Sequence, residues 1–105
     1  MKILLDECVP WPLHKLLKDC ACESVPQKGW NGMKNGELLN LAEGHYDLFL
    51  TADQNIPYQQ NLAGRRISVL QLSTNNLRRL IRAEQEIQAA IANMQPGKFH
   101  SLAIP

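Results

Sequence analysis

The chain has 105 residues, of which 45% are hydrophobic, so it can build one buried core and has no room for a second domain. Its formal charge of +1 hides an asymmetry, because residues 1–64 carry five lysines against eight acids and residues 65–105 carry six cations against two acids. The three cysteines are odd in number and lack a C-x-x-C pair, so they indicate neither a disulfide framework nor a zinc knuckle. No apolar signal region opens the chain, so we expect a cytoplasmic protein without membrane insertion.

The first predicted strand is the apolar run at residues 3–5, which ends at Asp6 and Glu7. Two carboxylates therefore follow directly on a strand end. Prolines and leucines in residues 10–19 predict the first helix, with the prolines in its first turn.

A weak second strand is predicted at residues 22–25, followed by a loop rich in glycine and asparagine. A short helix is then expected from Glu37, with Asn35 as its N-cap and Gly44 as its stop. The third strand is predicted at residues 46–51, whose continuous apolar run is typical of a parallel sheet covered on both faces.

Asp53 follows the third predicted strand, just as Asp6 follows the first. Residues 54–64 are polar and rich in turn formers, with room for one helical turn. Residues 67–72 alternate apolar and polar side chains and predict a fourth strand.

One long helix is predicted at residues 77–94, where apolar side chains keep a spacing of three and four that only Glu84 interrupts. Residues 73–76 supply its N-terminal cap. Residues 99–104 predict a last edge strand.

Strands that alternate with crossovers predict an α/β fold with a mainly parallel sheet in three layers, with helices on both faces. Placing the first strand between the second and the third gives a strand order that begins 2-1-3-4. The winding reverses between strands one and three, and open α/β sheets bind ligands at such a point, outside the carboxyl ends of the strands. We therefore expect Asp6 and Asp53 to meet there.

Carboxylates gathered in one cleft repel each other and need a cation or a proton, and oxygen ligands suit Mg²⁺ or Mn²⁺. Glu37 is a candidate third ligand, or else a first-turn acid that the helix dipole favours. The alternative to metal binding is that Asp6 is a loop-initiating aspartate and that Asp53 forms a turn with the backbone of Asn55. Glu7 is a weaker candidate, because adjacent side chains at a strand end point in opposite directions.

All five arginines fall within an eighteen-residue stretch, residues 65–82. They form either a phosphate-facing patch or the solvated face of a helix and its neighbouring loop. The predicted substrate contacts among them are Arg65, Arg66, Arg78 and Arg79. Two tryptophans, Trp11 and Trp30, could stack on bases or serve in packing, and Trp30 in the glycine-rich loop is the better candidate for function.

Three short segments, LLDE at 4–7, GELL at 36–39 and LFLTADQN at 48–55, resemble the PIN-like domain family. The closer resemblance is to its short branch found in toxin–antitoxin settings, and it covers roughly residues 2–82. It implies a metal-dependent nuclease, usually acting on RNA, in which acidic residues hold one or two Mg²⁺ or Mn²⁺ ions. It also implies an antitoxin partner, and a homodimer is a further expectation.

Asp6, Glu37 and Asp53 match three acidic positions of that family, which implies catalytic and metal-binding roles for them. Thr51 stands in the T-x-D strand end, where it could orient Asp53 or a water. The family's fourth acid has no counterpart here, and Asn75 is the candidate replacement. Three carboxylates instead of four would hold one metal ion instead of two and could leave the site slow or inactive.

The leading hypothesis is therefore a metal-dependent phosphodiesterase that cleaves RNA. A second hypothesis is a non-catalytic binding module in which the acids are a relic and Tyr58–Asn61, with the neighbouring arginines, meets a partner. A third is a receiver-like domain with Asp53 as phospho-acceptor. The third lacks a lysine after the last strand, since Lys98 precedes the last apolar stretch.

Overall fold

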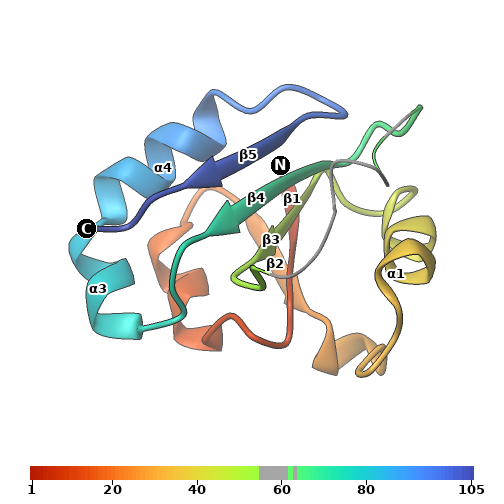
Figure 1. Ribbon diagram of the computed structural model, residues 1–105, viewed down its shortest axis with the longest axis horizontal. Helices are drawn as coiled ribbons and strands as arrows, with labels where there is room; N and C mark the ends of the chain where they lie inside the picture. The colour runs from red at the N-terminus through yellow and green to blue at the C-terminus, as the bar shows by residue number, and fades with distance from the viewer. Residues whose placement is uncertain (55–61, 63) are drawn as a thin grey trace.

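The computed structural model describes residues 1–54, 62 and 64–105, which fold around a five-stranded sheet (Figure 1). All neighbouring strands are parallel, in the order β2-β1-β3-β4-β5. The predicted order beginning 2-1-3-4 is thus confirmed, and the last predicted edge strand joins it as a fifth parallel strand. The strands are β1 (Lys2–Leu5), β2 (Ala21–Ser24), β3 (Leu48–Thr51), β4 (Ser68–Leu72) and β5 (Phe99–Leu102).

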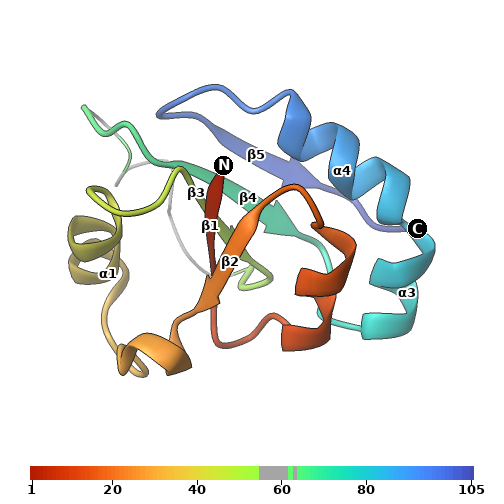
Figure 2. The ribbon, with the colours of Figure 1, turned by 180° about the vertical axis from the view of Figure 1, so that it is seen from behind.

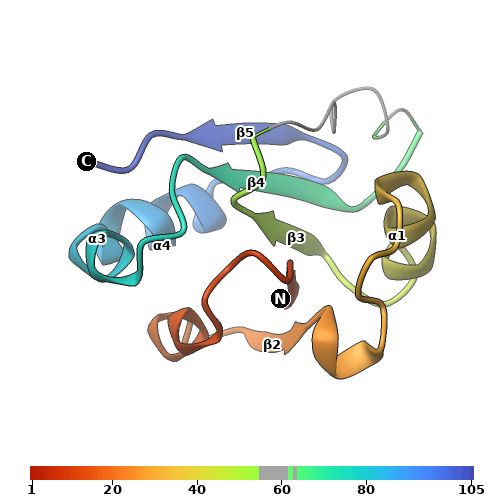
Figure 3. The same ribbon diagram turned by 60° about the horizontal axis from the view of Figure 1, so that its bottom comes forward.

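Helices cover both faces of the sheet, as predicted. On one face the 3₁₀ helix η1 (Trp11–Leu16) lies with α3 (Leu77–Arg82) and α4 (Glu84–Ala92), and on the other lies α1 (Asn35–Ala42) (Figures 1 and 3). Viewed from behind, a second 3₁₀ helix, η2 (Pro26–Lys28), follows β2 and leads toward α1 (Figure 2).

The apolar run of β3 shows why the sheet needs two layers of helices. Leu48 and Leu50 belong to the core beneath η1, α3 and α4, whereas Phe49 belongs to the core beneath α1. All three are fully buried, because successive strand side chains point to opposite faces. β1 and β4 divide their apolar residues between the two cores in the same way.

The first helix is shorter and tighter than predicted. It is a 3₁₀ helix over Trp11–Leu16, with Leu13 as its buried residue. His14 Nδ1 lies 2.6 Å from the carbonyl oxygen of Trp11, an oxygen that in an α-helix would accept from the amide of residue 15. The His14 side chain therefore takes up the Trp11 carbonyl oxygen, which an α-helix would use for a backbone hydrogen bond.

The long helix predicted at residues 77–94 is two helices, α3 and α4, separated at Ala83. Ala83 has φ −96° and ψ 21°, outside the helical range, and its amide donates to both Arg79 and Leu80. The apolar face continues across the break, because Leu80, Ala83 and Ile87 are all buried. The spacing of apolar residues consequently gives no sign of the interruption.

The start of α1 also differs from the prediction. Asn35 is the first residue of the helix and not its N-cap, which is Lys34 in an extended conformation. The predictions for Asn55, for Tyr58–Asn61 and for most of the turn at 54–64 lie outside the described residues. None of the helices in the described part of the chain has the length and apolar character needed to cross a membrane.

Candidate functional site

A cavity of about 420 Å³ opens at the carboxyl edge of the sheet. Asp6 and Glu7 reach it from the end of β1, Asp53 reaches it from the end of β3, and Lys34 reaches it from the residue before α1. β1 and β3 are neighbours at which the winding of the sheet reverses. The two aspartates that follow these strands therefore line one cavity, at the edge where α/β sheets bind ligands.

Asp6 is held by hydrogen bonds on both carboxylate oxygens. Its Oδ1 accepts from the amide of Glu7 at 2.8 Å, and its Oδ2 accepts from Thr51 Oγ1 at 2.7 Å. Cys8 Sγ lies 3.5 Å from the same Oδ2. The amide of Asp6 donates to Leu50 at 2.9 Å, so the residue continues the pairing of β1 with β3 before the chain turns.

Thr51, the last residue of β3, connects the two aspartates. Its hydroxyl is fully buried, donates to Asp6 and accepts from the amide of Asp53 at 3.1 Å. The position of Asp53 is thereby tied to that of Asp6 through a single side chain.

Gln71, on β4, supports the segment that carries Asp53. Its Nε2 donates to the carbonyl oxygen of Asp53 at 2.7 Å. Its Oε1 accepts from Ser101 Oγ on β5 at 3.2 Å. Because Gln71 is buried and uses both ends of its amide, it ties the loop after β3 to two further strands.

Burial governs the electrostatics at the floor of the cavity. Desolvation raises the pKa of Asp6 above its ordinary value; hydrogen bonds from Thr51, Glu7 and Cys8 oppose the rise, and the charge of Glu7 adds to it. Desolvation also raises the pKa of the Cys8 thiol, against a hydrogen bond from the Ala52 amide. A cation in the cavity would relieve the cost of a charged Asp6.

The other wall of the cavity is apolar and comes from the segment between β2 and α1 and from α1 itself. We call it the Trp30 wall, and it consists of Val25, Trp30, Met33 and Leu38. The amide of Trp30 donates to Val25 at 3.1 Å, and the amide of Met33 donates to Trp30 at 3.3 Å. Gly32, with φ +75°, supplies the turn between the two large side chains.

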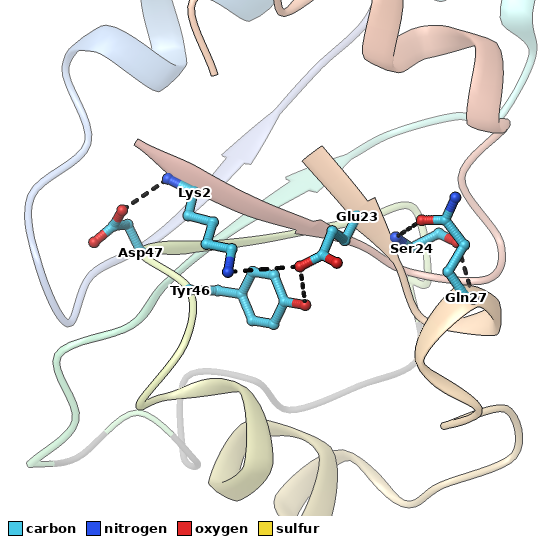
Figure 4. Close-up of polar contacts among 6 residues, drawn as sticks. All are labelled: Lys2, Glu23, Ser24, Gln27, Tyr46 and Asp47. Atoms are coloured by element: carbon cyan, nitrogen blue, oxygen red, sulfur yellow. Dashed lines mark hydrogen bonds and ion pairs between the residues drawn. The ribbon is translucent and has the colours of Figure 1, made fainter. Parts of the chain in front are cut away.

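Tyr46 contacts the Trp30 ring. The two rings meet edge to face with centroids 6.5 Å apart. The Tyr46 hydroxyl donates to Glu23 at 2.8 Å, and Lys2 Nζ lies 3.7 Å from the same carboxylate and 5.3 Å from the Tyr46 ring centroid (Figure 4). The Trp30 wall is thus braced by a polar network that begins on β1 and β2.

Two of the predicted ligands lie apart from the cavity. Glu37 is exposed in the first turn of α1, and Asn75 is exposed in the loop before α3; neither belongs to the described lining. Asn76 accepts from the amide of Arg79 and caps α3. Across the described residues, no three His, Cys, Asp or Glu side chains are grouped so as to hold a metal ion.

The arginines divide into two groups at opposite ends of β4. Arg65 and Arg66 precede the strand, where Arg65 Nη1 lies 3.3 Å from Glu43 Oε2 and the amide of Arg66 donates to the same carboxylate. This is the amino edge of the sheet, away from Asp6. Arg78 and Arg79 follow the strand on α3, and Arg79 donates to the carbonyl oxygens of Ile104 and Pro105.

The lysine that a receiver-like domain requires is not near the aspartates. Lys98 precedes β5 and so lies at the amino edge, whereas Asp53 lies at the carboxyl edge. The lysine at the cavity is Lys34, from a different segment.

Lys34, Cys8 and Met33 line the cavity although the sequence did not single them out. Lys34 had one available signal, because it directly precedes a helix that was expected to start near the cleft. No sequence signal marked Cys8, because the side chain of a cysteine two residues after Asp6 could point toward the cavity or away from it.

Comparisons with protein-family models, with curated proteins and with solved structures found no match to this chain. The likeness to PIN-like domains therefore depends on residues 4–7, 36–39 and 48–55, and it stays a prediction. The topology and the cavity stand independently of it.

Proposed function

We propose that this chain is a PIN-like phosphodiesterase that cleaves RNA with the help of Mg²⁺ or Mn²⁺. The observation that carries the proposal is that Asp6 and Asp53, from two neighbouring strand ends, line one cavity together with Lys34. A buried carboxylate beside further acids favours a bound cation, and an ammonium group at the same cavity suits a phosphate.

The donor set fits one Mg²⁺ ion. Magnesium is commonly bound through one or two carboxylates, with waters and substrate phosphate oxygens completing the coordination. Asp6 and Asp53 meet that requirement without Glu37, which agrees with the lack of a larger ligand group among the described residues. When bound, such an ion supplies Lewis-acid activation of water and of the phosphate.

The protein's own residues then divide the remaining tasks. Thr51 fixes the orientation of Asp6, and Gln71 fixes the backbone of Asp53. Lys34 contacts a phosphate oxygen of the bound strand. Arg65 and Arg66 lie at the opposite edge of the sheet, so we assign them no contact with the scissile phosphate; a wider role in substrate binding stays a prediction for all four arginines.

The test is cleavage of single-stranded RNA by purified protein in Mn²⁺. Wild type should cleave, and Asp53→Asn should lose more than about 100-fold of the rate, because residues that merely orient metal ligands commonly account for that much. Asp47→Asn is the matched control. Asp47 sits at the other end of β3 and accepts from the amide of Lys2 (Figure 4), and an asparagine oxygen can keep that bond.

Equal residual activity in wild type and Asp53→Asn would reject the proposal, since cleavage would then come from a contaminant. Loss of activity in Asp47→Asn as well would show that the assay reports general damage to the fold and not the site.

A non-catalytic binding module is the second candidate, and one observation favours it. Burial raises the pKa of Asp6, and the protonated form of this side chain needs no metal to be stable in its site. A thermal unfolding scan separates the candidates, because an ion that binds the folded state must raise the midpoint. No rise with Mg²⁺ or Mn²⁺ supports the binding module. An antitoxin partner and a toxin role remain expectations from the family resemblance.

A further inference from the structure

We propose that the Trp30 wall is a nucleobase subsite, so that the RNA strand binds with one unpaired base against Trp30 and its phosphate toward Lys34. The proposal deepens the function above and rests on it for the identity of the substrate. Its binding step needs no metal and no cleavage.

The cavity has two sides of different chemistry. The polar side is formed by Asp6, Glu7, Asp53 and Lys34, and the apolar side of the same 420 Å³ space is formed by the Trp30 wall. A volume of this size is typical of small-ligand sites, in which an apolar lining is combined with a few polar groups. A nucleotide has this same division, with a flat apolar base joined to an anionic phosphate.

Trp30 is suited to receive a base because it is only partly buried and its ring contacts a second aromatic ring, that of Tyr46. Its edge-to-face contact with Tyr46 holds the indole in place. Tyr46 is itself fixed by the hydrogen bond that its hydroxyl donates to Glu23 (Figure 4). A ring that is already ordered loses little conformational freedom when a base stacks on it. Base–aromatic stacking does not depend on sequence, because every base presents a flat π face.

Two lysines complete the match to a nucleic-acid strand. Lys28 Nζ lies 5.5 Å from the Trp30 ring centroid, and Lys34 lines the cavity beyond Met33. Lys28 is exposed and flexible, so its ammonium can leave the indole for a phosphate when a base arrives. Aromatic rings between cationic side chains are the usual arrangement of proteins that bind single strands.

The test compares binding of two fluorescent probes in the presence of chelator: a short oligouridylate and an abasic strand of the same length and charge. Wild type should bind the oligouridylate about tenfold more tightly, the loss that removal of one stacked base commonly produces. Trp30→Leu should abolish that preference, and Trp30→Phe should retain most of it.

Trp11→Leu is the matched control and should keep the full preference. Trp11 stacks on His14 with ring centroids 4.1 Å apart and packs against the core on the other face of the sheet. Thermal midpoints of all variants check that they are folded. If Trp30→Leu proves unstable, equal binding of the two probes by wild type still overturns the subsite, and a preference that wild type shows and Trp11→Leu keeps supports it.

Equal binding of the two probes by wild type overturns the subsite, as does an unchanged preference in Trp30→Leu. These failures are separate from failure of the proposed function. RNA cleavage without base preference rejects the subsite alone, and base preference without cleavage rejects the nuclease alone.

Discussion

Thr51 and Asp6 join the ends of two neighbouring strands through one buried hydrogen bond, in which Thr51 Oγ1 donates to Asp6 Oδ2 at 2.7 Å. The same hydroxyl accepts from the amide of Asp53. A single side chain thus sets the position of both aspartates at the cavity. The strand order alone brings the two residues to one edge, and Thr51 fixes them relative to each other.

Replacing Thr51 by valine should therefore damage both stability and activity. Valine has nearly the same shape but leaves a buried carboxylate and an amide without their partner, which commonly costs about 1–3 kcal/mol. We expect an unfolding free energy lower by that amount in urea denaturation, and RNA cleavage at least about tenfold slower. Thr51→Ser keeps the hydroxyl and should retain most of the activity. Full activity in Thr51→Val would show that the bond does not position Asp6.

The stability of the metal-free protein should depend on pH through Asp6. Burial raises the pKa of Asp6 above its ordinary value of 3.8, so between that value and the raised pKa the folded state holds a proton that the unfolded chain has released. The resulting stability is full below that ordinary value and is lost as pH rises through the raised pKa. Urea midpoints in chelator, compared between wild type and Asp6→Asn, check this. Wild type should lose stability relative to the variant over that range, and parallel profiles would contradict the expectation.

Gln71→Leu should weaken the site from a distance. The variant removes the hydrogen bonds to the Asp53 carbonyl and to Ser101, and it leaves the shape of the buried side chain similar. Cleavage should fall by about 10- to 100-fold, as for other residues that orient metal ligands. Ser101→Ala breaks only the outer bond and should cost much less. Equal effects of the two variants on cleavage would show that Gln71 acts through its bond to β5 and not by holding the backbone of Asp53.

A fold-level prediction concerns Gly97, which has φ +73° in the turn before β5. An alanine Cβ there would lie 2.6 Å from the carbonyl oxygen of Arg65, a backbone atom that cannot move aside cheaply. Gly29 has φ +74° but open space around it. Gly29→Ala should cost about 1–2 kcal/mol for the left-handed backbone alone, and Gly97→Ala should cost more. Equal unfolding free energies for the two variants would refute the clash.

The sequence predicted the sheet well because one physical pattern determined it. The run at Leu48–Leu50 is apolar at successive positions, as expected for a strand buried on both faces, and the aspartates mark where β1 and β3 end. The helices were harder to predict. The break at Ala83 preserves the apolar face, and the contact of His14 with Trp11 is invisible in a pattern of apolar spacing.

The sequence predicted the aspartates of the site but not the other side chains that line it, and the arginines illustrate why. Residues close in sequence need not be close in space, and the length of β4 separates Arg65 from Arg78 although the sequence groups them. Conversely, Lys34 and Cys8 line the cavity although both stand just outside the segments at 36–39 and 4–7 that the sequence singled out. Topology locates the ends of strands, whereas the side chains that reach a cavity depend on loop conformations.

The most direct test of the account is the location of Mn²⁺ by anomalous diffraction from crystals grown with that ion. We predict a peak in the cavity about 2 Å from carboxylate oxygens of Asp6 and Asp53. A cavity without such a peak, or a peak bound only by carboxylates elsewhere on the protein, would contradict the proposed metal site.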